Sequence, residues 1–304
     1  MTDSLLLELL ALQRGQIAEG LAWVGRCEPP RPGTRRVGHS QVESFAALVR
    51  DDDPRYWTPA ARQPVPPGLL LTYTLPLPWR PDAPTTPIWA RIPLPGDTLI
   101  NVSTSTVFHR EIGTGDEVML EEDVVSVSPE KKTRLGTGHF LTTRARFRTD
   151  DELAADHTNV MFRYGSDSPR ITAPTPPAPA PQGEPVFTLA VTRELCAHNV
   201  AASGDFFPGH YDDAYARSQG VAAAYLNTMF FQGLADRLAC RHLGVRSVRR
   251  RDLRMVAPAA VGDTIEARVR TTKDGAAEVE VRTARGLAAV ATVWSGHGVW
   301  SGRG

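Results

Sequence analysis

An aspartate and a histidine stand five positions apart in the stretch SGDFFPGHYDDAYA, as Asp205 and His210. The Pro208-Gly209 pair between them predicts a turn, which would hold the two side chains side by side. A carboxylate and an imidazole in that arrangement can take a proton from water and return one to carbon, which is general acid–base chemistry that needs no metal. On spacing alone, the alternative is a surface turn with two unrelated polar residues.

A helix is predicted shortly after this turn. The segment NTMFFQGLADRLACRHLG has a long apolar pattern and ends at Gly244, a residue type suited to stop a helix. The first N–H groups of a helix lack intrahelical acceptors, so they could face an oxygen that gains negative charge. The candidates for binding such an oxyanion are therefore Asn227, Thr228 and Met229.

The turn sequence, residues 203–216, resembles the signature of the MaoC-like hydratases, also called hydratase 2 enzymes. That signature reads Ser-Gly-Asp, two residues, Pro, one residue and His, followed by a short acidic helix, and the aspartate, proline and histidine of this chain match it. Two places depart from the family pattern. The residue before the proline is usually Asn and is Phe207 here, and Asn227-Thr228 stands where His-Gly is commoner.

The resemblance implies an α+β hotdog fold, in which an antiparallel sheet wraps a long helix. It also implies (R)-specific addition of water to a 2-enoyl thioester, or its removal from a 3-hydroxyacyl thioester, with Asp205 and His210 as the catalytic dyad. No cofactor is then expected, since the substrate arrives as a CoA or acyl-carrier-protein thioester. Residues 22–26, AWVGR, resemble the Trp-Ile-Gly-Arg opening of the two-module members.

A second turn, DDDPRYWTPAA, repeats the pattern near the N-terminus. Aligning Asp51 with Asp205 places Tyr56 on His210, and Gly-Asp pairs follow the two aspartates at offsets of 65 and 58 residues. Such similar offsets favour duplicated modules over chance similarity. A phenol with a pKa near 10 is a poor proton shuttle at neutral pH. We therefore expect one working site and one relic.

The repeat predicts a double hotdog: an N-terminal module over residues 1–165 with a degenerate site, a proline-rich linker over 166–185, and a C-terminal module over 186–304 that carries the dyad. The linker composition has no means of forming a packed core. Strands are predicted at 98–109, 118–127, 138–147, 157–164, 187–191, 248–256, 264–272, 277–284 and 286–294. The resemblance implies that the two modules share one continuous sheet.

Further helices are predicted in the N-terminal half. Leucines spaced from Leu5 to Ile17 indicate an N-terminal helix, and residues 39–50 indicate another, with Ser40 as N-cap and Glu43 completing a capping box. The central helix of the N-terminal module, within residues 66–79, is expected to be short or irregular because prolines soon interrupt it.

Aromatic side chains and a basic stretch complete the candidate site. Phe206, Phe207 and Phe230 are candidates for an acyl pocket, with simple core packing as the alternative. A resemblance of the turn and helix to actinobacterial steroid side-chain hydratases suggests a bulky, steroid- or polyketide-like acyl group. In residues 245–255, Arg249 and Arg251 would share a strand face and are weak candidates to bind a phosphate of CoA or an acyl carrier protein. The alternative is a strand face that is simply exposed to solvent.

Composition narrows the functional classes. Thirty-four basic residues balance 34 acidic ones, so no overall field favours nucleic acid or an anionic membrane. No apolar run approaches the roughly 20 residues of a membrane span. Three cysteines without CxxC spacing favour a reducing cytoplasm over a disulfide framework, and no metal-ligand spacing such as HExxH occurs.

The prediction is thus a cytoplasmic hydro-lyase acting on acyl-CoA or an acyl-carrier-protein substrate, as a homodimer or paired with another hotdog subunit. One alternative is a hotdog acyl-CoA thioesterase, which would release free thiol. The other is a non-catalytic acyl-binding or partner subunit, which Phe207 favours and the intact dyad disfavours.

Overall fold

Eleven strands form one antiparallel sheet in the part of the chain that the computed structural model describes, residues 10–79, 81, 86–171 and 183–296. The strand order is β1-β3-β5-β6-β2-β8-β11-β10-β9-β7, and β4 pairs with β5. The strands are β1 (Arg31–Pro32), β2 (Thr98–Phe108), β3 (Met119–Val127), β4 (Lys131–Lys132), β5 (Thr137–Thr149), β6 (Glu152–Tyr164), β7 (Phe187–Ala190), β8 (Val248–Met255), β9 (Thr264–Thr271), β10 (Ala277–Thr283) and β11 (Gly286–Ser295). The predicted strands are confirmed to within two residues at each end, except that β6 starts five residues earlier.

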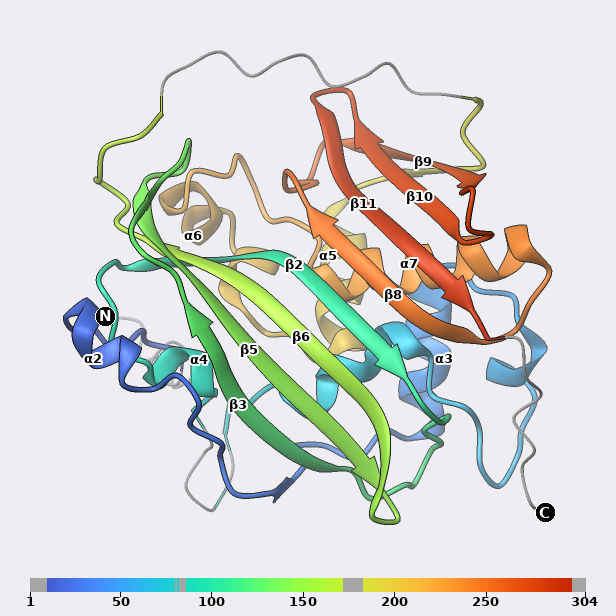
Figure 1. Cartoon of the computed structure of the whole chain (residues 1–304). Helices are drawn as coiled ribbons and strands as arrows, with labels where there is room; N and C mark the ends of the chain where they lie inside the picture. Colours follow the sequence, from blue (N-terminus) through green and yellow to red (C-terminus); the bar gives the residue numbers. More distant parts are fainter. Residues whose placement is uncertain (1–9, 80, 82–85, 172–182, 297–304) are drawn as a thin grey trace.

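The two halves of the chain meet in the middle of the sheet. Strand β2 pairs with β8, in a register that runs from Ser103 opposite Arg254 to Val107 opposite Arg250. In Figure 1 the green strands of the first half and the orange and red strands of the second lie side by side, with α3, α5 and α7 behind them. This continuous sheet over central helices is the double hotdog architecture that was predicted.

Helices α3, α5 and α7 pack on the inner face of the sheet and share one apolar core with it, whereas α2 and α4 pack in a second, smaller core with β3, β5 and β6. The helices are α2 (Ile17–Leu21), α3 (His39–Leu48), α4 (Ile88–Arg91), α5 (Arg193–Ser203), α6 (Asp213–Ser218) and α7 (Thr228–Leu243), with 3-10 helices η1 (Pro54–Tyr56), η2 (Pro67–Tyr73) and η3 (Pro208–His210). The short η2 confirms the prediction of an irregular central helix in the N-terminal half. Its counterpart α7 is long, is capped by Asn227 and ends at Gly244, where φ is 66°.

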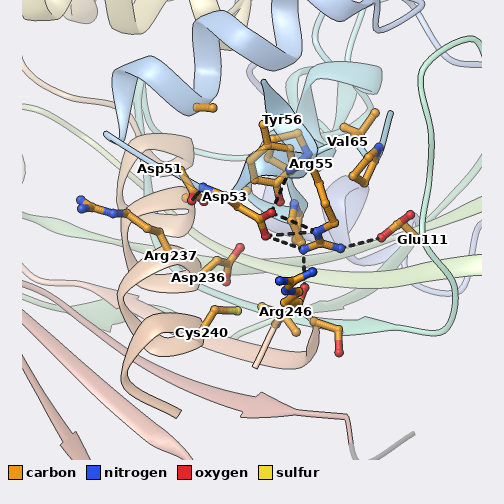
Figure 2. A pocket seen from close by; sticks show the side chains of 18 of the residues that line it. Asp51, Asp53, Arg55, Tyr56, Val65, Glu111, Asp236, Arg237, Cys240 and Arg246 are labelled. Carbon is orange, nitrogen blue, oxygen red and sulfur yellow. Dashed lines mark hydrogen bonds and ion pairs between the residues drawn. The ribbon is translucent and has the colours of Figure 1, made fainter. Parts of the chain in front are cut away.

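The duplication is visible in local geometry. Helix α3 leads to Arg50, whose φ is 55°, then to Asp51 and η1; helix α5 leads to Gly204, whose φ is 70°, then to Asp205 and η3. Figure 2 shows the N-terminal turn, with Asp51, Asp53, Arg55 and Tyr56. The downstream turns match as well: Asp116 Oδ2 accepts from the Gly113 N–H and Asp263 Oδ2 from the Ala260 N–H, each at 2.8 Å.

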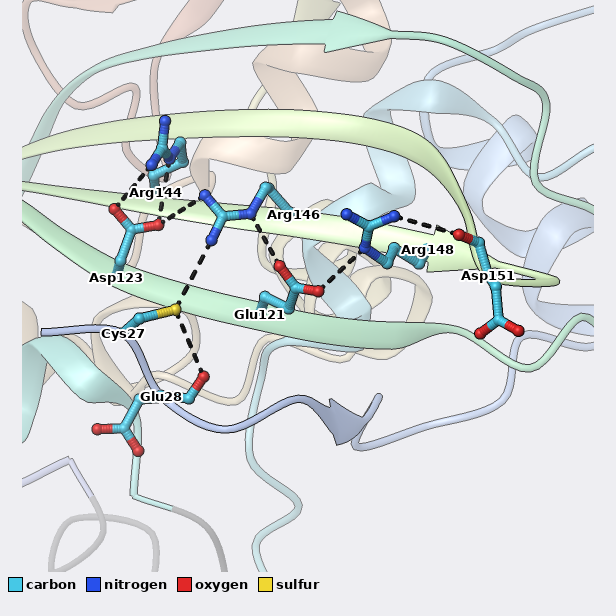
Figure 3. A network of polar contacts seen from close by, with 8 residues as sticks. All are labelled: Cys27, Glu28, Glu121, Asp123, Arg144, Arg146, Arg148 and Asp151. Carbon is cyan, nitrogen blue, oxygen red and sulfur yellow. Dashed lines mark hydrogen bonds and ion pairs between the residues drawn. The ribbon is translucent and has the colours of Figure 1, made fainter.

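The outer face of β3 and β5 carries paired charges. Residues Asp123 and Arg144 face each other across the two strands, as do Glu121 and Arg146, and their side chains form ion pairs at 3.1 and 3.0 Å. Figure 3 shows Arg146 joining both acids, with Cys27 beside them. Because side chains alternate along a strand, Ala145 and Phe147 of β5 point to the other face and enter the core.

Several predictions need correction or lie beyond the described residues. Residues 11–16 are not helical, because their backbone bonds the 88–94 region instead, as in Gln13 N–H to the Ala90 carbonyl; only Ile17–Leu21 forms a helix, and residues 1–9 lie outside the description. Helix α3 begins at His39 after Gly38, without a side-chain cap, so the capping box at Ser40 is wrong. Linker residues 172–182 are not described, and the boundaries 1–165, 166–185 and 186–304 stay predictions.

Candidate active site

The turn that carries Asp205 is built at the end of α5. The left-handed conformation of Gly204 reverses the chain there, and a Cβ at that position would also lie 2.6 Å from Nη1 of Arg35. Glycine is thus needed for both the conformation and the space. The Asp205 N–H then donates to Ser203 Oγ at 3.2 Å, and Asp205 Oδ1 accepts from the Phe207 N–H at 3.3 Å.

The imidazole of His210 faces the Asp205 carboxylate. Nδ1 lies 2.9 Å from the carbonyl oxygen of Tyr225, which can only accept, so we assign the hydrogen to Nδ1. This leaves Nε2 as the nitrogen that exchanges protons, and it lies 3.4 Å from Asp205 Oδ2. The ring is buried, with edge contacts to Phe207 and Tyr225 at centroid distances of 5.5 and 5.0 Å. Phe207, at the family's usual Asn position, therefore packs against the histidine.

The surroundings keep Asp205 ionised. Burial alone would raise the pKa of this carboxyl, but the His210 charge and hydrogen bond, the Phe207 N–H and Asn227 outweigh it, and the pKa lies below its ordinary value. The Asp205 side chain is 20% exposed, so it remains within reach of solvent. An ionised carboxylate beside an imidazole that can gain or lose a proton is a pair suited to acid–base work.

The side chain of Asn227 has a different role from the predicted one. Its Oδ1 accepts from the Phe230 N–H at 2.9 Å and caps α7, while Nδ2 donates to Ser203 Oγ at 2.9 Å and to Asp205 Oδ2 at 3.3 Å. These bonds use both N–H donors of the amide and its oxygen, so the side chain caps the helix and positions the aspartate.

The start of α7 leaves two other amides for an oxyanion. The N–H groups of Thr228 and Met229 precede the capped N–H of Phe230, at the end of the helix where the macrodipole is positive. Thr228 Oγ1 accepts from Asn101 Nδ2 of β2 at 3.1 Å, so a side chain from the N-terminal half borders this helix end.

The three phenylalanines predicted for an acyl pocket lie in different surroundings. Phe230 is fully buried and packs edge-on against Phe231 at 5.6 Å, as expected for core packing. Phe206 is exposed, with the Arg35 guanidinium 5.8 Å from its ring centroid. Phe207 lies between His210 and Tyr215. Of the three phenylalanines, these contacts therefore place only Phe206 and Phe207 near the dyad.

The shared face predicted for Arg249 and Arg251 is wrong. The register between β8 and β11 shifts at this point, since Trp294 pairs with Arg250 and Ser295 with Val248. Arg249 is thereby exposed, whereas Arg251 is fully buried and forms an ion pair with Asp236 on α7. Arg251 cannot meet a phosphate, and Arg249, which donates to the Phe108 carbonyl at 3.0 Å, remains a candidate.

Sequence reasoning missed several groups that hold the dyad. Ser203 and the Tyr225 carbonyl fix its two members, and Arg35 of the N-terminal half donates to the Gly204 carbonyl at 2.8 Å. The serine of the Ser-Gly-Asp signature could have indicated the role of Ser203. Neither the carbonyl nor the distant arginine has a local signal in the sequence.

The turn at Asp51 is the site of a large cavity. Burial raises the pKa of the Tyr56 phenol well above its ordinary value, so the phenol stays neutral, as the relic prediction requires. A cavity of about 400 Å³ adjoins this turn, and neither Asp205, His210 nor Asn227 lines it.

Within the described chain, no group of three or more His, Cys, Asp or Glu side chains is placed to hold a metal ion.

Known proteins show similarity to both the sequence and the fold. The family model "FAS1-like, dehydratase domain region" matches residues 22–157. A probable enoyl-CoA hydratase alpha subunit of Thermomonospora curvata is 38% identical over 76 residues, which is 25% of this chain; the chain spans about a quarter (24%) of that relative's length.

Solved structures match over most of the chain. A MaoC-like dehydratase from Phytophthora capsici has a TM-score of 0.68 at 16% identity, covering 93% of this chain and 100% of that one. A Mycobacterium tuberculosis protein with a double hotdog fold has a TM-score of 0.55 at 15% identity, covering 89% and 95%.

The described chain has a double hotdog fold, and its dyad turn pairs a carboxylate with an imidazole. The dyad turn resembles the MaoC-like signature, the dehydratase-region model matches residues 22–157, and solved MaoC-like dehydratases share the fold. No helix among the described residues has the length and apolar character to cross a membrane.

Proposed function

We propose that the protein adds water to a 2-enoyl thioester, or removes it from a 3-hydroxyacyl thioester, and that it does so with R stereochemistry. The observation that carries the proposal is the pairing of Asp205 Oδ2 with His210 Nε2 at 3.4 Å, beside the N-terminal end of α7. The similarity to an enoyl-CoA hydratase subunit supports the same chemistry.

The geometry suggests how a water molecule would be activated. When His210 is neutral, with its hydrogen on Nδ1 and bonded to the Tyr225 carbonyl, Nε2 and Asp205 Oδ2 are two neighbouring acceptors, and one water can donate a hydrogen to each. As the water oxygen bonds the β-carbon, one O–H bond breaks and its proton passes to a dyad member. The π electrons move toward the thioester carbonyl, and the α-carbon then takes a proton from the dyad.

The growing enolate charge needs donors, and α7 offers them. The Thr228 and Met229 N–H groups lie at the positive end of the helix, so they are suited to bind the thioester oxygen as it becomes negative. No metal or redox cofactor takes part in this scheme, and the carrier of the acyl group is CoA or an acyl carrier protein. The name of the alpha-subunit relative supports pairing with a second subunit.

The proposed function can be tested with 2-enoyl-CoAs of increasing bulk, from short acyl chains to steroid- or polyketide-like groups. Loss of enoyl absorbance should occur without release of free CoA thiol, and Asp205→Asn or His210→Ala should lower turnover by at least about a hundredfold. Unchanged turnover in either folded variant would remove the dyad assignment. Release of thiol would instead identify a thioesterase. If the protein co-purifies with a second hotdog protein and is inactive alone, it would be a non-catalytic partner subunit.

A further inference from the structure

The cavity at the N-terminal turn is large enough to bind a small molecule. Its volume of about 400 Å³ lies within the roughly 300–1,000 Å³ of typical small-molecule sites. Apolar side chains such as Phe45, Val65 and Phe108 line it, together with polar groups of α7. Figure 2 shows Asp236 and Cys240 extending from α7 on one side of it, with Tyr56 and Val65 on the other.

The cavity lies along a different part of α7 from the dyad. Gly68 of η2 touches Gly233 of α7 so tightly that a Cβ on Gly68 would lie 2.5 Å from the Gly233 backbone. Asp236 follows the helix cap Asn227 by nine residues, which is about 14 Å along an α-helix. The cavity and the dyad thus use different segments of the same helix.

Three residues that line this cavity have a buried polar atom without a partner within the described structure: Arg237 at Nε, Tyr73 at Oη and Asp236 at Oδ1. Tyr73, which is 1% exposed, has no hydrogen-bond partner for Oη; Asp236, which is 5% exposed, uses Oδ2 for Arg251 and has none for Oδ1. Both residues line the cavity. Buried polar groups in proteins are nearly always hydrogen-bonded, so these two atoms point to a ligand that completes them.

The ionisable side chains around the cavity favour a neutral occupant. Burial raises the pKa of the Asp51 carboxyl and of the Tyr73 phenol, and it raises that of the Cys240 thiol to about 12. The same desolvation would act on an anionic ligand group placed among them. Arg55 is already paired, with Asp53 at 2.9 Å and with Glu111 at 3.3 Å.

We propose that this cavity is a second ligand-binding site, separate from the dyad, for a compact, uncharged and mainly apolar molecule that carries a hydroxyl group. Hydroxyl groups can donate to Asp236 Oδ1 and accept from Tyr73 O–H, while the apolar body fills the space beside Val65 and Phe108. The site does not depend on the hydratase activity, since none of its residues belongs to the dyad.

The probe is 2-naphthol, which is apolar, compact and has one hydroxyl, and its binding to the full chain is measured by fluorescence and calorimetry. We expect saturable binding at one site, weaker binding of 2-methoxynaphthalene, which cannot donate, and exclusion of the anion 2-naphthoate. Tyr73→Phe removes only the unpartnered hydroxyl and should weaken binding of 2-naphthol about three- to tenfold. Cys240→Trp should abolish binding by filling the space, and Val65→Phe serves the same purpose if the first variant does not fold.

Independence from the dyad is tested in the same titrations. Asp205→Asn should bind 2-naphthol as the wild type does, and a 2-enoyl-CoA should not compete with it. The proposal is overturned if the folded wild type shows no saturable binding up to about 1 mM. It is equally overturned if the space-filling variants bind normally, or if a 2-enoyl-CoA displaces the probe, because the cavity would then be part of the catalytic site.

Discussion

Nη2 of Arg35 donates to the carbonyl oxygen of Gly204 at 2.8 Å and so joins two residues that are 169 positions apart. Gly204 directly precedes Asp205, so a residue of the N-terminal half fixes the turn that presents the C-terminal carboxylate. Burial lowers the pKa of the Arg35 guanidinium, and the charge of Asp205 opposes that shift. The N-terminal half is therefore a structural part of the candidate active site.

Replacing this arginine should impair catalysis without changing the dyad itself. We expect Arg35→Ala to lower turnover by about ten- to a hundredfold, because a small displacement of a catalytic group is costly. The adjacent Arg36 is exposed and pairs with the exposed Glu117, so Arg36→Ala is the matched control and should keep turnover within about twofold. Steady-state assays of both variants decide the point, and normal turnover in Arg35→Ala would show that its bond is dispensable.

Asn227 should affect stability and activity through different bonds. Asn227→Ala removes the α7 cap and is expected to lower the free energy of unfolding by about 1 kcal/mol. Asn227→Ser keeps a capping oxygen but is too short to bond both Ser203 and Asp205, so it should recover stability without recovering turnover. Urea unfolding and kinetics are measured on both variants; full activity in Asn227→Ser would argue against a positioning role.

The relic turn should tolerate change that the working turn does not. Tyr56→Phe removes the phenol hydroxyl and is expected to leave turnover within about twofold, whereas His210→Ala should cost at least about a hundredfold. Comparable losses in the two variants, measured under one set of assay conditions, would mean that both turns take part in catalysis.

The buried pair of Asp236 and Arg251 predicts a pH dependence of stability. Burial raises the pKa of Asp236 from about 4 in the unfolded chain to about 6, despite the neighbouring Arg251. Folding therefore favours the protonated acid more than the unfolded chain does. Its contribution to stability is complete below about pH 4 and is lost as the pH rises through 6. Asp236→Asn cannot titrate, and the unfolding free energy of this variant relative to the wild type should therefore rise between pH 4 and 6. A difference that stays flat across that range would contradict the shift.

The strand pattern and the dyad could be predicted because local sequence determines them. Alternating apolar residues define the longer strands such as β2, β5 and β10, and the Pro-Gly turn brings Asp205 and His210 together within six residues. The register shift that separates Arg249 from Arg251 arises from pairing between β8 and β11, so strict alternation gave the wrong face.

Contacts between distant segments account for the other errors. Residues 11–16 have a helical apolar pattern, but their backbone groups bond the 88–94 region, and tertiary pairing overrides the local preference. The Arg35 bond to Gly204 and the cavity between the Asp51 turn and α7 likewise join segments whose closeness no local pattern encodes.

The most direct test of the central claim follows the oxygen atom. The purified protein is incubated with a 2-enoyl-CoA in heavy-oxygen water, and the product is examined by mass spectrometry and chiral separation. The account predicts the label in the 3-hydroxyl group of the (R)-3-hydroxyacyl-CoA, at a rate at least about a hundredfold lower in Asp205→Asn. Label found instead in a free carboxylic acid, or incorporated equally fast by Asp205→Asn, would contradict it.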